Sequence, residues 1–299
     1  MNNNLFNSMS KFKSIDQGAL FMIVSTFFSA LSGAVAKVLS EGMDPVEMVF
    51  YRNVIGVIII LYSLKKVPVL INMSKLHLLV LRGVFGTLAM LFFFYTIANI
   101  PLGEAVVLNK TSPFFVTILA FYLMKESINT NTIIALIIGF IGIILVMKPF
   151  GVSISIDHIY GVLGGFFAAA AYTTIKKIKD IYDTRVIMLS FMGIGAILPF
   201  LLYLFTPYVT FQIHTDPFIW FLLILMAVVS TISQWFLTKA YSLSKGSIIG
   251  VVSYSSIPFA VGFGLMLGDA IPDIYTISGI ILIIFGGILV GRKKEIKKS

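Results

Sequence analysis

Ten long apolar stretches follow one another along the chain, separated by short polar connections. Because about 20 apolar residues cross the hydrocarbon core of a bilayer as a helix, each stretch predicts a membrane-spanning helix. The predicted spans are 18–39, 45–64, 76–98, 102–124, 130–149, 157–177, 184–206, 217–241, 246–268 and 273–291. The pattern therefore predicts an all-α polytopic membrane protein with ten transmembrane helices.

The fifth and tenth spans end on nearly the same residues, which indicates an internal repeat. Gly142 begins the run Gly-Ile-Ile-Leu-Val, and Gly287 begins the run Gly-Ile-Leu-Val, 145 residues later. The same spacing separates Pro113 from Pro258. Since each repeat crosses the membrane five times, the second repeat must lie inverted relative to the first. The expected units are a cytoplasmic N-terminal segment, two five-helix repeats and a basic cytoplasmic tail, at 1–17, 18–150, 151–291 and 292–299.

Composition and charge place the chain in a membrane and orient it. Of its residues, 58% are hydrophobic and 12% are charged, whereas about a quarter are charged in soluble domains. With the N-terminus inside, seventeen of the 22 Lys and Arg residues fall on the cytoplasmic side and only Lys37 and Lys148 fall outside. This asymmetry predicts that both termini are cytoplasmic, in a bacterial inner membrane. The net charge of +9 therefore indicates topology and not a nucleic-acid partner.

The first apolar run and the metal-ligand residue types narrow the function further. The run is about twenty residues long, longer than the core of a signal peptide, so we expect an uncleaved span. The chain has no cysteine, and we predict that its three histidines, His77, His158 and His214, fall in connections, where we expect them to be solvated. We therefore expect no metal and no cofactor.

Three basic residues lie within predicted spans, where a charge is costly and marks a functional candidate. Arg52 and Lys110 each lie about eight residues from the outer end of a span, roughly 12 Å deep. Two cations at one depth favour a shared aqueous cavity that receives an anionic group, although each could instead extend along its helix or pair across helices. Arg82 is shallower, and we expect its side chain to reach back to lipid phosphates.

A polar patch surrounds Lys110 and ends in a proline. Pro113 removes the backbone donor that would bond the carbonyl of Asn109, leaving that carbonyl for a ligand or for the side chain of Thr111. The offset of the repeat pairs Asn109 with Tyr254 and Lys110 with Ser255, so the two patches should meet near the midplane. Three further candidates for substrate contact are Tyr51, Gln234 and Trp235.

Proton coupling would require an intramembrane carboxylate or histidine. Only Glu47 and Glu104, both near the predicted outer face, are plausible proton relays.

Short segments in both halves resemble the EamA-type branch of the drug/metabolite transporter superfamily. The segments are Phe50-Tyr51-Arg52, Leu81-Arg82-Gly83, Pro101 to Ala105, Leu123 to Glu126, Gly139 to Gly142, Ser256-Ile257-Pro258 and Gly268-Asp269. Asp269 stands where the family usually has glutamate, and Lys110 is not a general family residue. The resemblance implies two repeats and a transporter, but its members carry amino acids, nucleotide-like metabolites, vitamins or drugs.

Together these features predict a secondary transporter, as monomer or homodimer, that moves a small polar metabolite by alternating access. The cations favour an anionic or zwitterionic substrate, and the direction of transport stays open. A lipid-linked sugar flippase is the alternative within transport. An intramembrane transferase enzyme is a third hypothesis, but the chain lacks the clustered carboxylates or histidines that such chemistry needs.

Overall fold

The computed structural model describes residues 17–69, 74–124, 130–147, 155–244, 249–250 and 252–291, and within these ranges every regular element is helical. The helices are α2 (Gln17–Leu39), α3 (Pro45–Lys66), α4 (Leu76–Asn99), α5 (Leu102–Asn109), α6 (Ser112–Met124), α7 (Thr130–Met147), α8 (Ile156–Ile178), α9 (Thr184–Phe205), α10 (Pro217–Leu243), η1 (Ser253–Ser255), α12 (Ser256–Met266) and α13 (Ile274–Gly291). The predicted all-helical fold is confirmed.

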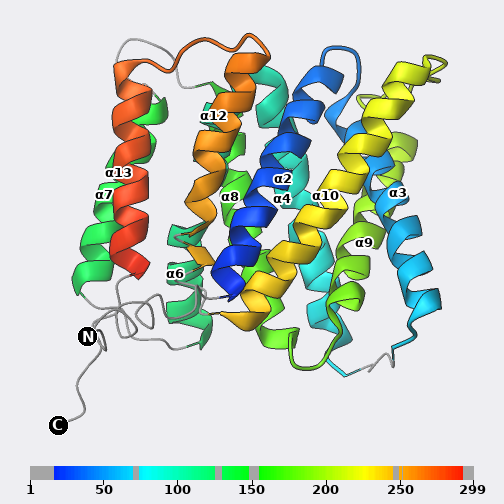
Figure 1. Cartoon of the computed structure of the whole chain (residues 1–299), viewed down its shortest axis with the longest axis horizontal. Coiled ribbons are helices and arrows are strands. Elements are labelled where there is room, and N and C mark those ends of the chain that lie inside the picture. Colours follow the sequence, from blue (N-terminus) through cyan, green and yellow to red (C-terminus); the bar gives the residue numbers. More distant parts are fainter. Residues whose placement is uncertain are drawn as a thin grey trace, which may run out of the picture.

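Long helices run roughly parallel to one another and form a single bundle (Figure 1). The start of α2 and the end of α13 lie at the same end of this bundle, hereafter the terminal end. Five helices, α2, α3, α4, α9 and α10, are each long and apolar enough to cross a membrane alone. Outward-facing side chains such as Ile58, Tyr122 and Phe140 are more than half exposed, as expected where lipid is the solvent.

The helix pairs obey a twofold relation between the two halves. The contact of α2 with α10 in one half corresponds to the contact of α8 with α4 in the other. In the same way, the α3–α10 contact corresponds to the α9–α4 contact. The contact of α12 with α2 corresponds to the contacts of α5 and α6 with α8. The α3–α9 contact and the α7–α13 contact each join two helices that the twofold relation exchanges. Every major contact thus has its mate in the other half, which is the arrangement of two inverted five-helix repeats.

Aspartates start corresponding helices in the two repeats. The Asp44 side chain accepts a hydrogen bond from Val46 N at 2.7 Å, and the Asp183 side chain accepts one from Arg185 N at 2.8 Å. These two N-caps begin α3 and α9, which the twofold relation exchanges. An aspartate at this position satisfies a free N–H of the first turn and favours helix initiation.

Two helices are interrupted close to the prolines of the repeat, where the sequence pattern predicted continuous spans. The fourth span, predicted as one helix over 102–124, is broken at Lys110 and Thr111 between α5 and α6. In the second repeat the 3₁₀ turn η1 stands at the corresponding place before α12. The break follows from Pro113 and Pro258, because each removes a backbone donor from the preceding turn.

The prediction that all three histidines lie in connections between helices is wrong for two of them. His77 lies in the first turn of α4, and His158 lies in the first turn of α8. The basic tail and the N-terminal segment lie outside the described residues.

Candidate functional site

A cavity of about 110 Å³ lies between the two repeats, in the middle and the terminal half of the bundle. It is lined by α2, α3, α4, α8, α9 and α10, and by the interrupted ends of α5 and α12. A cluster of buried apolar side chains that includes Leu79, Ile178 and Leu237 lies toward the terminal end. A second cluster, including Leu39, Ile97 and Leu102, fills the opposite end. Side chains of both clusters, among them Met22 and Phe191, also line the cavity, so its wall is part polar and part apolar.

Two buried arginines from neighbouring helices share one aromatic ring on the cavity wall. The guanidinium carbon of Arg52 lies 5.7 Å, and that of Arg82 4.6 Å, from the ring centroid of Phe191. The two side chains are 5% and 2% exposed. Arg52 donates to Asn53 Oδ1 at 3.4 Å and contacts the sulfur of Met90. Cation–π contacts with Phe191 therefore hold both charges at the cavity without neutralising them.

The prediction that Arg82 reaches back to lipid phosphates is wrong. Arg82 is buried, lines the cavity and donates to Gln234 Oε1 at 3.4 Å. Its position depends on Gly86, one turn further along α4, because a Cβ there would collide with the Arg82 guanidinium. Depth alone suggested the membrane surface, but the rotation of α4 against α9 turns the side chain inward.

Lys110 and Asn109 reach the cavity at the break between α5 and α6. The Lys110 ammonium has no hydrogen-bond partner among the residues that the structure describes. Pro113 leaves the Asn109 carbonyl without its helical donor, and this oxygen lies beside Gly165 of α8. Only a residue without a side chain fits there, because a Cβ on Gly165 would collide with Thr111 Oγ1. The glycine thus lets α8 approach the broken helix.

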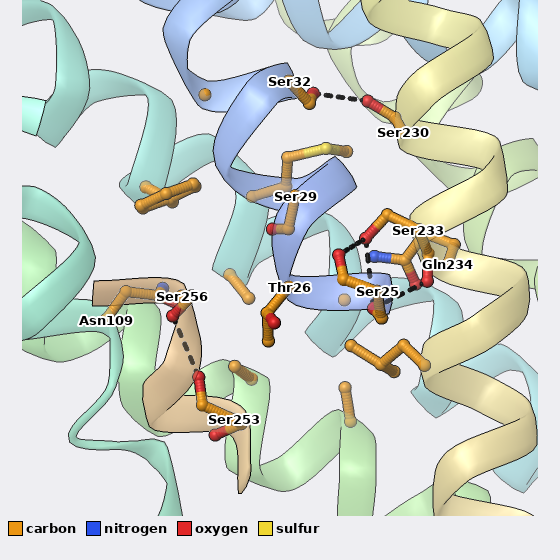
Figure 2. Close-up of a pocket in the computed structure, with 18 of the residues that line it drawn as sticks. Ser25, Thr26, Ser29, Ser32, Asn109, Ser230, Ser233, Gln234, Ser253 and Ser256 are labelled. Carbon is orange, nitrogen blue, oxygen red and sulfur yellow. Dashed lines mark hydrogen bonds between the residues drawn. The ribbon is translucent and has the colours of Figure 1, made fainter. Parts of the chain in front are cut away.

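Hydroxyl groups line the cavity from α2 and α10 (Figure 2). Ser25, Ser29 and Ser32 follow one another along one face of α2, at helical spacing. Ser32 Oγ lies 2.6 Å from Ser230 Oγ, and Ser25 Oγ donates to Ser233 O at 2.8 Å. These bonds join the first repeat to the second. The Ser29 hydroxyl has no partner in the described part of the chain, which leaves it free for a ligand.

The α2 serines and Arg82 are site residues that the sequence reasoning missed. The spacing of the serines in a span that is otherwise apolar was the available signal.

Four other predicted site residues lie behind the cavity wall and do not line it. Thr111 and Tyr254 are buried, and their hydroxyls have no partner among the described residues. Ser255 pairs with Thr26 at 2.7 Å between the hydroxyl oxygens. Trp235 packs against Phe21 and Phe236, whereas its neighbour Gln234 lines the cavity. The patches of the two repeats do meet at the cavity, but through Ser253 and Ser256 in the second repeat.

Tyr51 and Glu47 belong to a separate cluster near the end opposite the termini. The Glu47 carboxylate is fully buried, and its Oε1 lies 2.9 Å from Nε2 of His214. The same oxygen accepts a hydrogen bond from Gln212 N at 3.1 Å. Tyr51 packs edge-on against Trp220, 5.4 Å between centroids, and beside His214. His214 is therefore a paired and buried residue, contrary to the expectation of a solvated one.

Glu104 and Asp269 bind backbone and side-chain donors at that same end. Thr276 Oγ1 donates to Glu104 Oε1 at 3.1 Å. Asp269 Oδ2 accepts from Leu102 N at 2.7 Å, and its Oδ1 lies 4.0 Å from Lys37 Nζ. These contacts tie the connection between α12 and α13 to the first repeat and help to close this end of the bundle.

The charge balance of the cavity is one-sided. Arg52, Arg82 and Lys110 line it, and no carboxylate lines it among the residues that the structure describes. Hydroxyls and two side-chain amides, from Asn109 and Gln234, complete its polar wall. Such a wall can bind a small polar molecule with acidic groups, and it offers neither an acid–base pair nor a nucleophile beside a base.

Comparison with known proteins agrees with the two repeats. The profile of the EamA-like transporter family matches residues 16–148 and, a second time, residues 156–292. The chain belongs to the EamA-like transporter family. Membership makes it a membrane transporter, and its bacterial relatives support a multi-pass location in the bacterial inner membrane.

Several bacterial relatives align with nearly the whole chain. The pseudopaline exporter of Pseudomonas aeruginosa strain PAO1 is 30% identical over 94% of this chain and 98% of its own length. An uncharacterised transporter of Helicobacter pylori strain 26695 is 29% identical over 94% of this chain and 97% of its own. The riboflavin transporter of Vibrio cholerae is 24% identical over 86% of both chains.

One solved crystal structure matches the fold with a TM-score of 0.67 and 15% sequence identity. It covers 92% of this chain and 96% of the other. At this identity the likeness supports the fold alone.

Proposed function

We propose that this transporter carries a small anionic or zwitterionic metabolite through the cavity between its repeats, by alternating access. The observation that carries the proposal is the unbalanced cationic wall formed by Arg52, Arg82 and Lys110. Burying an unpaired ion costs several kcal/mol, and an acidic substrate would recover part of that cost. Ser29 and Gln234 supply neutral hydrogen bonds for the rest of the molecule.

The seams between the repeats support alternating access. Helices α2 and α10 meet through serine hydroxyl pairs, and the corresponding helices α8 and α4 meet through small residues such as Gly164 and Ala168. Small residues allow close backbone approach, and aromatic rings such as those of Phe92 and Phe167 stack across the α4–α8 contact, 5.7 Å between centroids. In this mechanism the Lys37–Asp269 contact must separate for the cavity to open at the end opposite the termini.

Named relatives support a small-molecule substrate but differ in which one. They are named for export of pseudopaline and for transport of riboflavin and S-adenosylmethionine. A flippase for lipid-linked sugars remains the alternative, and it would need a groove for the lipid chain beside the cavity. An enzyme is disfavoured by family membership and by the lack of acid–base pairs on the described cavity wall.

A charge-sorted ligand screen tests the proposal. Thermal unfolding of the purified protein would be measured with anionic, zwitterionic, neutral and cationic metabolites. We expect stabilisation by members of the first two classes, because a ligand that binds only the folded state raises the melting temperature, and a tighter ligand at equal concentration raises it further. Stabilisation by neutral or cationic compounds alone would overturn the proposed substrate class.

Uptake into proteoliposomes then tests the role of Lys110. For a metabolite that stabilises the protein, Lys110→Ala should lower uptake by about tenfold or more, as expected for a lost charge-assisted hydrogen bond. Lys110→Arg, which keeps the positive charge, should retain more of the parent's uptake than Lys110→Ala does. Lys239→Ala is the matched control, because Lys239 is a cation that lies 5.9 Å from the Trp235 ring and does not line the cavity. Parent-like uptake by Lys110→Ala would refute the cationic site.

A further inference from the structure

The number and placement of the cavity cations carry information on the substrate beyond the sign of its charge. Arg52, Arg82 and Lys110 come from α3, α4 and the α5–α6 break, all in the first repeat. The second repeat contributes Ser230, Ser233 and further neutral groups. Among the described lining residues the cavity thus holds three positive charges and no negative one.

The two arginines contact the same ring on the cavity wall. Each guanidinium lies over the Phe191 ring, so their separation can be no larger than the sum of the 5.7 Å and 4.6 Å centroid distances. Their hydrogen bonds to side-chain oxygens are long, 3.4 Å in both cases, and reach only the neutral acceptors of Asn53 and Gln234. Arg82 Nε has no partner among the described residues. A carboxylate or phosphate between the guanidinium groups would engage donors that are otherwise unused.

Lys110 reaches the cavity from a different element, the break between α5 and α6. Its chain neighbour Asn109 lies on one side of the α2 hydroxyl face in Figure 2, beside Ser256. Gln234, which accepts the hydrogen bond from Arg82, lies on the other side. The free hydroxyl of Ser29 lies between them. The chain neighbour of Lys110 and the hydrogen-bond acceptor of Arg82 thus lie on opposite sides of the α2 serines.

We propose that the substrate carries at least two acidic groups, one bound between Arg52 and Arg82 and the other bound by Lys110. Ser29 contacts the part of the molecule that links them. This inference rests on the proposed function and narrows its substrate class from anions and zwitterions in general to polyacids. The physical reason is charge balance: with three cations on the cavity wall, a single acidic group leaves two positive charges uncompensated, and a second acidic group recovers more of their desolvation cost.

A homologous series of carboxylates tests the number of acidic groups without any mutation. Butanoate, butanedioate and propane-1,2,3-tricarboxylate have similar carbon skeletons and one, two and three carboxylates. Binding to the purified full-length protein in nanodiscs would be measured by thermal unfolding at constant pH and ionic strength. We expect the dicarboxylate to bind about tenfold or more tightly than the monocarboxylate, as one additional charge-assisted hydrogen bond implies.

Variants then assign the two sites. Lys110→Met should reduce dicarboxylate affinity to that of the monocarboxylate and leave the monocarboxylate unchanged. Arg82→Met should weaken both ligands, and Lys239→Met, outside the cavity, should change neither. If Lys110→Met does not fold, the parent series alone decides the question.

The possible failures are distinguishable. Equal affinity of the parent for one and two carboxylates would overturn the two-site inference and leave the anion carrier intact. Binding of neutral or cationic compounds only, with no response to any carboxylate, would overturn the proposed function as well.

Discussion

Gly86 gives a sharp test of how the cavity holds its central arginine. An added Cβ at this position would collide with the guanidinium of Arg82 and would lie 2.6 Å and 3.0 Å from two carbons of the Phe191 ring. Real Cβ atoms do not approach carbon so closely, so Gly86→Ala must displace the guanidinium, the ring or both. The contact that it breaks is the one that keeps the arginine on the cavity wall.

The expected magnitude follows from the same contacts. Overpacking of this kind costs about 1–3 kcal/mol of stability, and the Arg82–Phe191 contact itself contributes about 0.5–2 kcal/mol. Loss of a hydrogen bond to a charged group costs about 1.5–3 kcal/mol, so anion binding should weaken by about tenfold to a hundredfold. The gain in helix propensity from Gly to Ala, about 1 kcal/mol, opposes the loss of stability.

Gly193→Ala is the matched control, because a Cβ there meets nothing within 4 Å. Both substitutions gain the same helix propensity, so their difference in melting temperature isolates the collision. Anion binding would be measured for both variants and again in an Arg82→Met background. The reasoning is refuted if Gly86→Ala binds anions like the parent, or if its effect on binding persists undiminished when Arg82 is absent.

Four further outcomes are expected. A double-mutant cycle of Ser32→Ala and Ser230→Ala, measured by unfolding in mixed micelles, should give a coupling free energy of about 0.6–1.7 kcal/mol. Strictly additive losses of stability would contradict the 2.6 Å bond between the two hydroxyls. His214→Ala leaves the buried Glu47 carboxylate without its imidazole hydrogen-bond partner and should cost about 1–3 kcal/mol of stability. It should also speed amide exchange in 206–216, which Glu47→Gln should partly reverse, whereas unchanged exchange would disprove the pairing. Gly279→Ala places a Cβ 2.6 Å from a backbone oxygen of α7 and should lower stability by about 1–3 kcal/mol; a parent-like melting temperature would show that α7 and α13 are further apart. A reporter enzyme fused to the C-terminus should be active only in the cytoplasm, and periplasmic activity would reverse the inferred orientation.

The interrupted helices show what local chemistry predicts well. Pro113 and Pro258 lack a backbone N–H, and this defect acts within one helical turn, whatever surrounds it. The structure accordingly has the breaks at Lys110–Thr111 and at Ser253–Ser255. The placement of Lys110 on the cavity follows in the same way, because a charge in an apolar span must reach a polar environment.

The direction of side chains around each helix was not predictable. In a soluble helix the polar face identifies the side that meets water. Here both lipid and protein neighbours are apolar, so most spans are hydrophobic on every side and their rotation leaves little trace in the sequence. For this reason Trp235 and Tyr254 were expected in the cavity and pack elsewhere, whereas Arg82 was expected at the surface and lines the cavity.

The sequence by itself determined the number of spans and the repeat, because hydrophobic length acts locally. It also placed the two prolines beside which the structure breaks spans that were predicted as continuous. Only the tertiary structure decided which polar groups share the cavity. The rotation of α4 against α9 directs Arg82 toward Phe191, and the crossing of α2 and α10 brings the α2 serines to Ser230 and Ser233. These are contacts between residues more than a hundred positions apart, and they depend on how whole helices pack, which no local pattern specifies.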